Sequence, residues 1–259
     1  DVGQEGLELA YDDWLRGVPG KELVLKDRYG HVVDIVDVKR KAKPGDQLTL
    51  SLDHRIQYLA YRELKQTVQD NQAKSGSIVV LDVKTGEVLG MANYPSYNPN
   101  HPQREIQKNR ALVDAYELGS VLKPIVLSKA FENNVIPVGQ YIDIPRRLSL
   151  DDKVIVDSKN HEKLTPKEII MVSSQIGASK IAIELGYKEL KKNYYDFGFT
   201  KPISVNFPSS AFGYMNIKEN VVDKELASLG YGYGITISPF QIASAYSVFA
   251  NKGTFKDFK

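Results

Sequence analysis

Residues 117–134 constrain the fold of this chain more than any other stretch. Ser120 is the only serine that is followed by a lysine three positions later, and apolar residues then recur at helical spacing behind Lys123. Pro124 is tolerated because it falls in the first turn of the expected helix. We therefore expect an amphipathic helix that begins beside Ser120, ends near Glu132, and carries Ser120 and Lys123 on one face.

This pair of side chains suits covalent catalysis. A serine hydroxyl is a poor nucleophile until a neighbour accepts its proton, and a lysine can accept it once burial or a second cation lowers the lysine pKa. The N-terminus of a helix adds free N–H groups and a positive dipole end, which stabilise a developing oxyanion. The same spacing arises by chance about once in a chain of this length, so it also fits a helix-capping serine beside a solvated lysine.

Composition indicates a globular protein with one large domain and room for a small appendage. Of the 259 residues, 42% are hydrophobic and 25% are charged, and the formal net charge is +2. With so little excess positive charge, we expect no nucleic-acid partner. There are no cysteines and the four histidines are scattered, so we expect neither a metal nor a cofactor. No apolar run reaches the length of a membrane span.

The first part of the chain predicts a small N-terminal unit. Two strand-like runs, 22–26 and 32–38, flank a turn, and the basic run 39–45 resembles a solvated linker. We place a boundary there, with a linker and remnant over 1–46 and the main domain over 47–259.

The main domain begins with a predicted strand over 47–52 and a helix from Asp53 to Asn71. Two strands within 77–92 follow, joined at Lys84-Thr85-Gly86. The tripeptide Lys-Thr-Gly is a catalytic motif of serine acyl-transferases, but here we interpret it as a turn because it sits at a hairpin tip and precedes Ser120.

Later helices have clear capping signals. Thr165-Pro166 and Ser238-Pro239 place a capping side chain and a proline at two helix starts. We expect the first of these helices to reach Gln175, further helices over 176–185 and 188–197, and a last helix that ends near Ala250.

Seen together, several segments of the chain resemble the transpeptidase region of class B penicillin-binding proteins, and of the division-specific septal enzymes in particular. The segments are Gly6-Leu7-Glu8, Tyr11-Asp12, Leu15-Arg16-Gly17, residues 75–77 through 91–93, Asn98-Pro99-Asn100, Asn109-Arg110-Ala111, Gly119-Ser120 with Lys123-Pro124, Ser173 to Lys180, Gly232-Tyr233-Gly234 and Ser238-Pro239. Each is weak alone, but they follow the family's order over most of the chain.

The resemblance implies a fold class and three catalytic residues. The fold is α+β, like that of penicillin-binding proteins and serine β-lactamases, with an antiparallel sheet flanked by helices, a central Ser120 helix and a small N-terminal pedestal remnant. Ser120 would take the acyl group from a D-Ala-D-Ala stem peptide or from a β-lactam, and Lys123 would accept its proton. Ser173 corresponds to the serine of the Ser-x-Asn motif, which shuttles a proton to the leaving group. An amine of a neighbouring stem peptide would then form the crosslink.

Two departures from the family pattern bear on activity. Gln175 stands where the Ser-x-Asn motif has asparagine, so this substrate-binding amide is one methylene longer. The family's third motif, Lys-[Thr/Ser]-Gly after the last helix, is missing, because Lys252-Gly253-Thr254 has the wrong order. That strand supplies one oxyanion-hole donor, which is worth about 10²–10³ in rate. We therefore expect the natural protein to continue past Lys259 and the chain alone to be a poor catalyst.

The resemblance also implies a location and partners. It implies septal cell-wall synthesis, an N-terminal anchor in the inner membrane that is absent from this chain, a periplasmic catalytic domain, and division-machinery membrane proteins that include a glycan polymerase as partners. One alternative is a serine β-lactamase, against which the pedestal-like N-terminus and the lack of a Ser-Asp-Asn motif argue. The other is a catalytically impaired homologue that acts as a division scaffold or β-lactam sensor.

Overall fold

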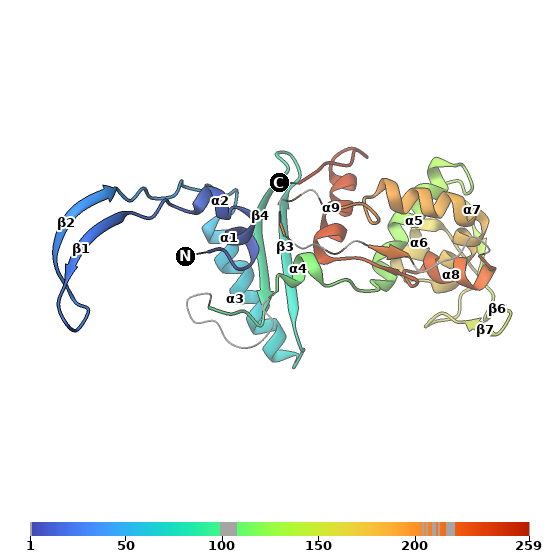
Figure 1. The fold of residues 1–259 in the computed structure, drawn as a ribbon. Coiled ribbons are helices and arrows are strands. Elements are labelled where there is room, and N and C mark those ends of the chain that lie inside the picture. The colour runs from blue at the N-terminus through green and yellow to red at the C-terminus, as the bar shows by residue number, and fades with distance from the viewer. Residues whose placement is uncertain are drawn as a thin grey trace.

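The computed structural model describes residues 2–98, 108–203, 205, 207–208, 211, 213–215 and 221–258. Pro99 and Asn100 of the resembling motifs and the last residue, Lys259, lie outside this part. Along the length of the molecule, an N-terminal β-ribbon is followed by a central β-hairpin between helices and then by a helical part (Figure 1). Among the described residues, no helix combines the length and apolar character needed to cross a membrane.

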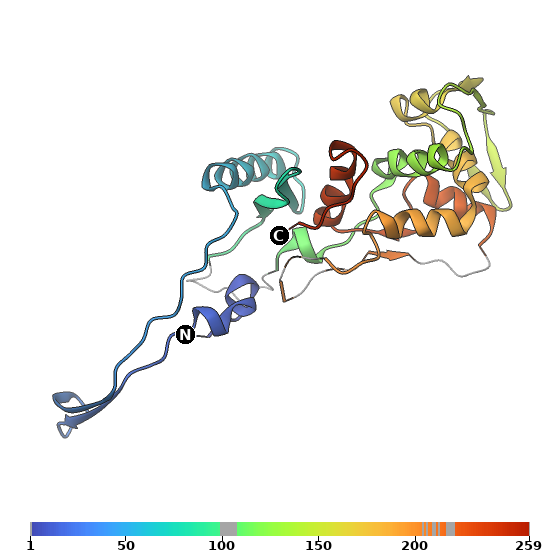
Figure 2. The ribbon, with the colours of Figure 1, turned by 90° about the horizontal axis from the view of Figure 1, so that it is seen from above.

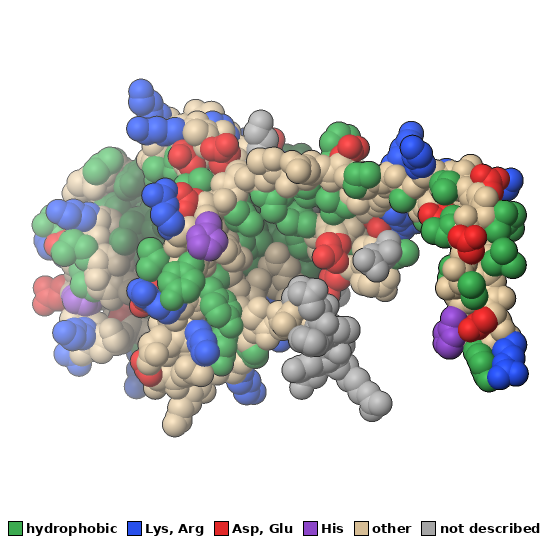
Figure 3. Space-filling model, turned by 90° about the vertical axis from the view of Figure 1, so that its left-hand side faces the viewer, with side chains coloured by type: hydrophobic (Ala, Val, Ile, Leu, Met, Phe, Trp, Pro, Cys, Tyr) green, Lys and Arg blue, Asp and Glu red, His purple; other side chains and the backbone are tan. Residues whose placement is uncertain are grey.

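The N-terminal unit consists of two short helices and an antiparallel ribbon, and the ribbon projects from the rest in both ribbon views (Figures 1 and 2). Its apolar side chains are exposed along both strands, and Figure 3 views the molecule from this side. The second strand is longer than predicted, so the start of the basic run belongs to a strand and not to a linker. The elements are α1 (Gly6–Ala10), α2 (Asp12–Leu15), β1 (Lys21–Lys26) and β2 (Val32–Arg40).

The centre is a β-hairpin with helices on both faces. The elements are α3 (His54–Asp70), β3 (Gly76–Asp82), β4 (Glu87–Tyr94), α4 (Arg110–Val113) and α9 (Pro239–Ala250). On one face, Ile78 packs with Leu64 and Val68 of helix α3. On the other face, Val79 and Leu81 pack with helices α4 and α9, because successive side chains of a strand point to opposite faces.

The helical part is built around α5, whose inward side chains are almost fully buried. It packs against α7, and the largest hydrophobic cluster in the described part of the chain lies between them and their neighbours. The elements are η1 (Gly119–Leu122), α5 (Lys123–Glu132), β5 (Ile142–Asp143), β6 (Leu148–Leu150), β7 (Lys153–Ile155), β8 (Lys163–Leu164), α6 (Pro166–Met171), α7 (Gln175–Asp196), β9 (Tyr214–Met215), α8 (Asp223–Gly230) and β10 (Ile235–Thr236).

The structure confirms several local predictions. Asp53 caps α3 by accepting from two backbone N–H groups. Lys84-Thr85-Gly86 is the turn between β3 and β4, held by the Asp82 carboxylate, with Gly86 at φ +81°. Gly186, with φ +73°, breaks α7 where the sequence predicts two helices.

Three predictions need correction. The helix that Thr165 caps ends at Met171 and does not reach Gln175, because the chain turns at Ser173, whose φ is +56°, and a new helix begins at Gln175. Residues 47–52 form no strand, although the end of this segment runs beside β4. Its contacts with β4 are single hydrogen bonds and not a backbone ladder, for example Ser51 Oγ to Val88 O at 2.8 Å and Asp53 N–H to Leu89 O at 2.9 Å. Ser120 is not on an α-helix, because η1 is a turn of 3₁₀-helix and α5 begins only at Lys123.

Candidate active site

Ser120 lies on the 3₁₀ turn that leads into α5. In a 3₁₀-helix, side chains three positions apart lie directly above one another, so this turn keeps Ser120 and Lys123 on one side. Ser120 is exposed, whereas only 1% of the Lys123 surface is accessible. A substrate can therefore reach the hydroxyl while the amine stays away from water.

Ser173 comes to the same place from the short connection between α6 and α7. A capping box formed by Thr165 and Glu168 fixes the start of α6, and Ser174 caps the start of α7. Between the two helices, Ser173 adopts φ +56°, a left-handed conformation that costs a non-glycine residue about 1–2 kcal/mol. The chain thus turns sharply at the residue that contacts Lys123.

A chain of hydrogen bonds joins the three predicted catalytic side chains. The Ser173 hydroxyl donates to Ser120 Oγ at 2.8 Å, and Lys123 Nζ donates to Ser173 Oγ at 2.9 Å and to the Ser173 carbonyl at 2.6 Å. Lys123 thus reaches Ser120 through Ser173 and not directly, which the sequence does not indicate. Serine hydroxyl groups can rotate about their C–O bonds, so a proton can also move in the opposite direction, from Ser120 through Ser173 to Lys123.

The environment of Lys123 shifts its equilibrium toward the neutral form. Burial lowers the pKa of Lys123 from 10.5 to about 8, although the nearby Asp157 carboxylate acts in the opposite direction. A neutral amine can accept a proton, so Lys123 has the property that a base beside a serine nucleophile requires.

The turn that carries Ser120 is fixed by a close backbone contact. Gly119 donates its N–H to the Gly232 carbonyl at 3.0 Å, and both glycines have positive φ values, +59° and +91°. A Cβ added to Gly232 would lie 1.9 Å from the Gly119 oxygen, so only glycine fits there. This explains in physical terms why the Gly-Tyr-Gly segment belongs to the site.

Neighbouring helices hold η1 and α5 in place. Asn193 of α7 is buried and donates to the Ile125 carbonyl at 2.8 Å, and the Tyr246 hydroxyl of α9 donates to the Val121 carbonyl at 2.6 Å. Both bonds satisfy carbonyls near the start of the catalytic helix and tie it to the two helices that flank it.

Gln175 and Asp157 lie on the rim of this cluster. Gln175 is exposed at the first position of α7, and its backbone N–H donates to the Asp157 carboxylate at 2.6 Å. Sequence reasoning missed Asp157, because its partners come 17–19 positions later and no local pattern marks them.

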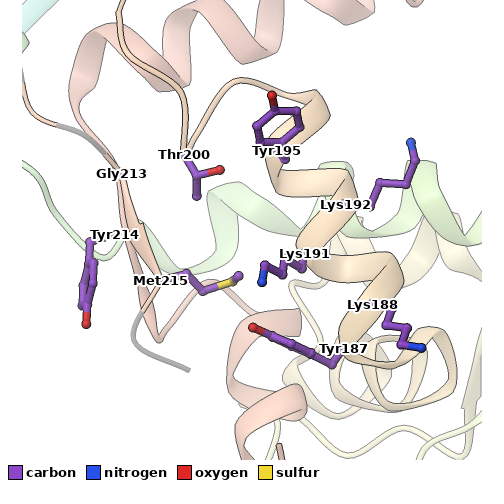
Figure 4. A pocket seen from close by; sticks show the side chains of 9 residues that line it. All are labelled: Tyr187, Lys188, Lys191, Lys192, Tyr195, Thr200, Gly213, Tyr214 and Met215. Atoms are coloured by element: carbon purple, nitrogen blue, oxygen red, sulfur yellow. The ribbon is translucent and has the colours of Figure 1, made fainter. Parts of the chain in front are cut away.

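A separate cavity of about 850 Å³ lies along the second half of α7 (Figure 4). In the close-up, the tips of Lys191, Tyr187 and Met215 point toward one another. Its lining excludes Ser120, Lys123 and Ser173, so we do not assign it to the catalytic chemistry. Within the described ranges, no three histidine, cysteine, aspartate or glutamate side chains gather as metal ligands.

Comparison with known proteins places the chain in a family. Residues 76–259 match the family described as "Penicillin binding protein transpeptidase domain", and residues 1–50 match "Penicillin-binding Protein dimerisation domain". The chain belongs to the penicillin-binding protein transpeptidase family. The two matched ranges leave only residues 51–75 between them.

The chain is also similar in sequence to curated proteins named as peptidoglycan D,D-transpeptidases. The chain is 36% identical to "Peptidoglycan D,D-transpeptidase FtsI" of Escherichia coli K12 over 98% of its length and 43% of the relative. It is 37% identical to "Probable peptidoglycan D,D-transpeptidase PenA" of Neisseria meningitidis Z2491, over 97% and 44%. The chain thus spans less than half the length of these curated relatives.

Among solved structures, the apo transpeptidase domain of penicillin-binding protein 3 from Burkholderia pseudomallei is similar with a TM-score of 0.73 at 36% identity. The match covers 82% of this chain and 61% of that one. The α+β penicillin-binding fold expected from the sequence is confirmed.

Proposed function

We propose that this chain is the acyl-transfer part of a peptidoglycan D,D-transpeptidase, with Ser120 as nucleophile, Lys123 as base and Ser173 as proton relay. The observation that carries the proposal is the hydrogen-bonded path from exposed Ser120 through Ser173 to buried Lys123. The names of the FtsI and PenA relatives supply the reaction class, peptidoglycan D,D-transpeptidation. The substrate that the family resemblance implies is a stem peptide that ends in D-Ala-D-Ala.

Acylation begins with neutral Lys123. The Ser120 oxygen attacks the carbonyl of the penultimate D-alanine, while its proton passes to the Ser173 hydroxyl and the Ser173 proton passes to Lys123 Nζ. The tetrahedral intermediate collapses, the C–N bond breaks, and the terminal D-alanine leaves with a proton returned from Lys123 through Ser173. The products are a Ser120 ester and free D-alanine.

Transfer reverses this proton path. An amine of a second stem peptide attacks the Ser120 ester, loses its proton toward Lys123 through Ser173, and forms the new amide as Ser120 regains a proton. A β-lactam follows the first step only, because its ring opens and the leaving group stays attached. The Gln175 amide lies at the rim, where it binds the backbone of the substrate.

The proposal extends to the setting of the whole protein. We infer a periplasm-facing enzyme held at the inner membrane, working with division-machinery proteins that include a glycan polymerase, with a boundary near residue 46 between pedestal and transpeptidase domain. The matches over 1–50 and 76–259 support two units on either side of such a boundary.

The test uses the natural protein that contains this chain, with a synthetic pentapeptide ending in D-Ala-D-Ala and an amine acceptor such as glycine. We expect the wild type to release D-alanine and form the peptide–glycine product, and Ser120→Ala to do neither. Release of D-alanine without amide product would indicate a hydrolase. No release from folded wild type would favour the division scaffold or β-lactam sensor instead.

A further inference from the structure

Asp157 links the β6–β7 hairpin region to the catalytic turn, although it belongs to none of the motifs. It is half-buried, and its carboxylate accepts three hydrogen bonds. They come from Ser174 Oγ at 2.5 Å, the Gln175 N–H at 2.6 Å and the Ile176 N–H at 3.1 Å. The Asp157 side chain, although distant in sequence, thus bonds to the three consecutive residues that follow Ser173 in the chain.

These bonds organise the whole first turn of α7. The first N–H groups of a helix have no partner within it, and the positive end of the helix dipole favours a negative charge. Asp157 satisfies two of these groups itself. The third, Gly177 N–H, donates to Ser174 Oγ at 2.9 Å, and Asp157 holds that hydroxyl.

The same contacts reach the proton relay. Ser173 has a strained left-handed backbone, and it directly precedes the residues that Asp157 holds. Its hydroxyl and carbonyl both accept from Lys123, so a shift of this turn would break the path between Lys123 and Ser120. We propose that Asp157 is the positioning residue for acyl transfer, because it fixes the Ser173–Gln175 turn against Lys123. This inference rests on the proposed function.

Asp157 also acts through its charge. The groups that touch the Lys123 amine, the Ser173 hydroxyl and carbonyl, are uncharged, and Ser120 of η1 beyond them is uncharged too. Of the charged groups in the described residues, only the Asp157 carboxylate acts on the Lys123 ammonium, and it favours the charged form. Hydrogen bonding and charge can be separated, because asparagine retains an acceptor for the two N–H groups and loses the charge.

The experiment measures acylation by a fluorescent penicillin against pH, together with the melting temperature, in the natural protein. Asp157→Ala should lower the acylation rate constant about 100-fold on the high-pH plateau, as expected when a reacting group is displaced by about 1 Å, and should also move the midpoint of the pH profile to lower pH because it loses the same charge. Asp157→Asn should keep most of the rate at high pH and move the midpoint of the pH profile to lower pH, because Lys123 loses its counter-charge.

Asp53→Ala is the matched control. Asp53 caps α3 by accepting from the Arg55 and Ile56 N–H groups, as Asp157 does for α7, but it lies outside the catalytic cluster. Its variant should lose stability and keep the wild-type acylation rate.

The inference is overturned if folded Asp157→Ala acylates like Asp53→Ala, or if Asp157→Asn leaves the pH midpoint in place. Failure of the wild type itself to react would instead refute the proposed function, so the two failures are distinguishable.

Discussion

Lys123 gives the sharpest prediction, because its proposed role requires a neutral amine. Burial lowers the pKa of Lys123 to about 8. At pH 7 the amine is then neutral in about one molecule in ten, whereas the ordinary value of 10.5 would leave about one in three thousand neutral. The gain is about 300-fold in the population of the neutral amine, which is about 3 kcal/mol in the free energy of forming it at this pH.

The perturbation is pH, and the assay is the second-order rate constant for acylation by a fluorescent penicillin between about pH 6 and about pH 9.5. Because a protonated lysine cannot accept a proton, the rate constant should rise about tenfold per pH unit below pH 8 and level off above it. In Lys123→Arg the rate constant should fall by about 10²–10⁴ and lose this pH dependence, since arginine stays protonated.

Lys129 on the same helix provides the control. It is also buried, which disfavours its charge, but pairing with Glu132 and Glu189 outweighs burial and raises the pKa of Lys129. Lys129→Arg should therefore keep the wild-type midpoint. A wild-type profile that is flat, or a midpoint near 10.5, would refute the reasoning about Lys123.

Three further substitutions test the parts of the site separately. Ser173→Ala removes the relay hydroxyl and should lower the acylation rate constant by about 10²–10⁴ with little change in melting temperature; a rate close to wild type would show that Lys123 reaches Ser120 by another route. Gly232→Ala places a Cβ 1.9 Å from the Gly119 oxygen, so the Ser120 turn must move and acylation should fall about 100-fold, as followed by stopped-flow fluorescence. Asn193→Ala removes one of two side-chain donors to the Ile125 carbonyl, because Ser128 Oγ still donates to it at 2.7 Å, and should lower the free energy of unfolding by about 0.5–1.5 kcal/mol in urea titrations; an unchanged midpoint would argue against the Asn193 bond.

The fold could be predicted from the sequence wherever the signal is local. Helix caps and tight turns depend on residues only a few positions apart. The structure confirms the caps predicted at Thr165-Pro166 and Ser238-Pro239 and the turn predicted at residues 84–86. The strand predicted over 47–52 failed because alternation describes only one half of a pairing. The neighbouring β4 forms its ladder with β3 and meets this segment only through single hydrogen bonds.

The candidate site divides in the same way. Ser120 and Lys123 could be paired from their spacing, and Ser173 from its place in an ordered set of motifs. Three features of the site could not be predicted from the sequence. They are the 3₁₀ turn at Ser120, the hydrogen-bonded path from Ser120 to Lys123 through Ser173, and the three hydrogen bonds to Asp157. They depend on contacts between segments far apart in the chain, such as Gly119 with Gly232, and local propensity carries no information about these.

The most direct test of the central claim is the intact mass of the protein after incubation with benzylpenicillin, compared between wild type and Ser120→Ala, followed by peptide mapping. We predict one stable adduct of benzylpenicillin mass on the wild type, located at Ser120, and none on the variant. An adduct that persists in Ser120→Ala, or a folded wild type that never gains mass, would contradict the assignment of Ser120 as the nucleophile.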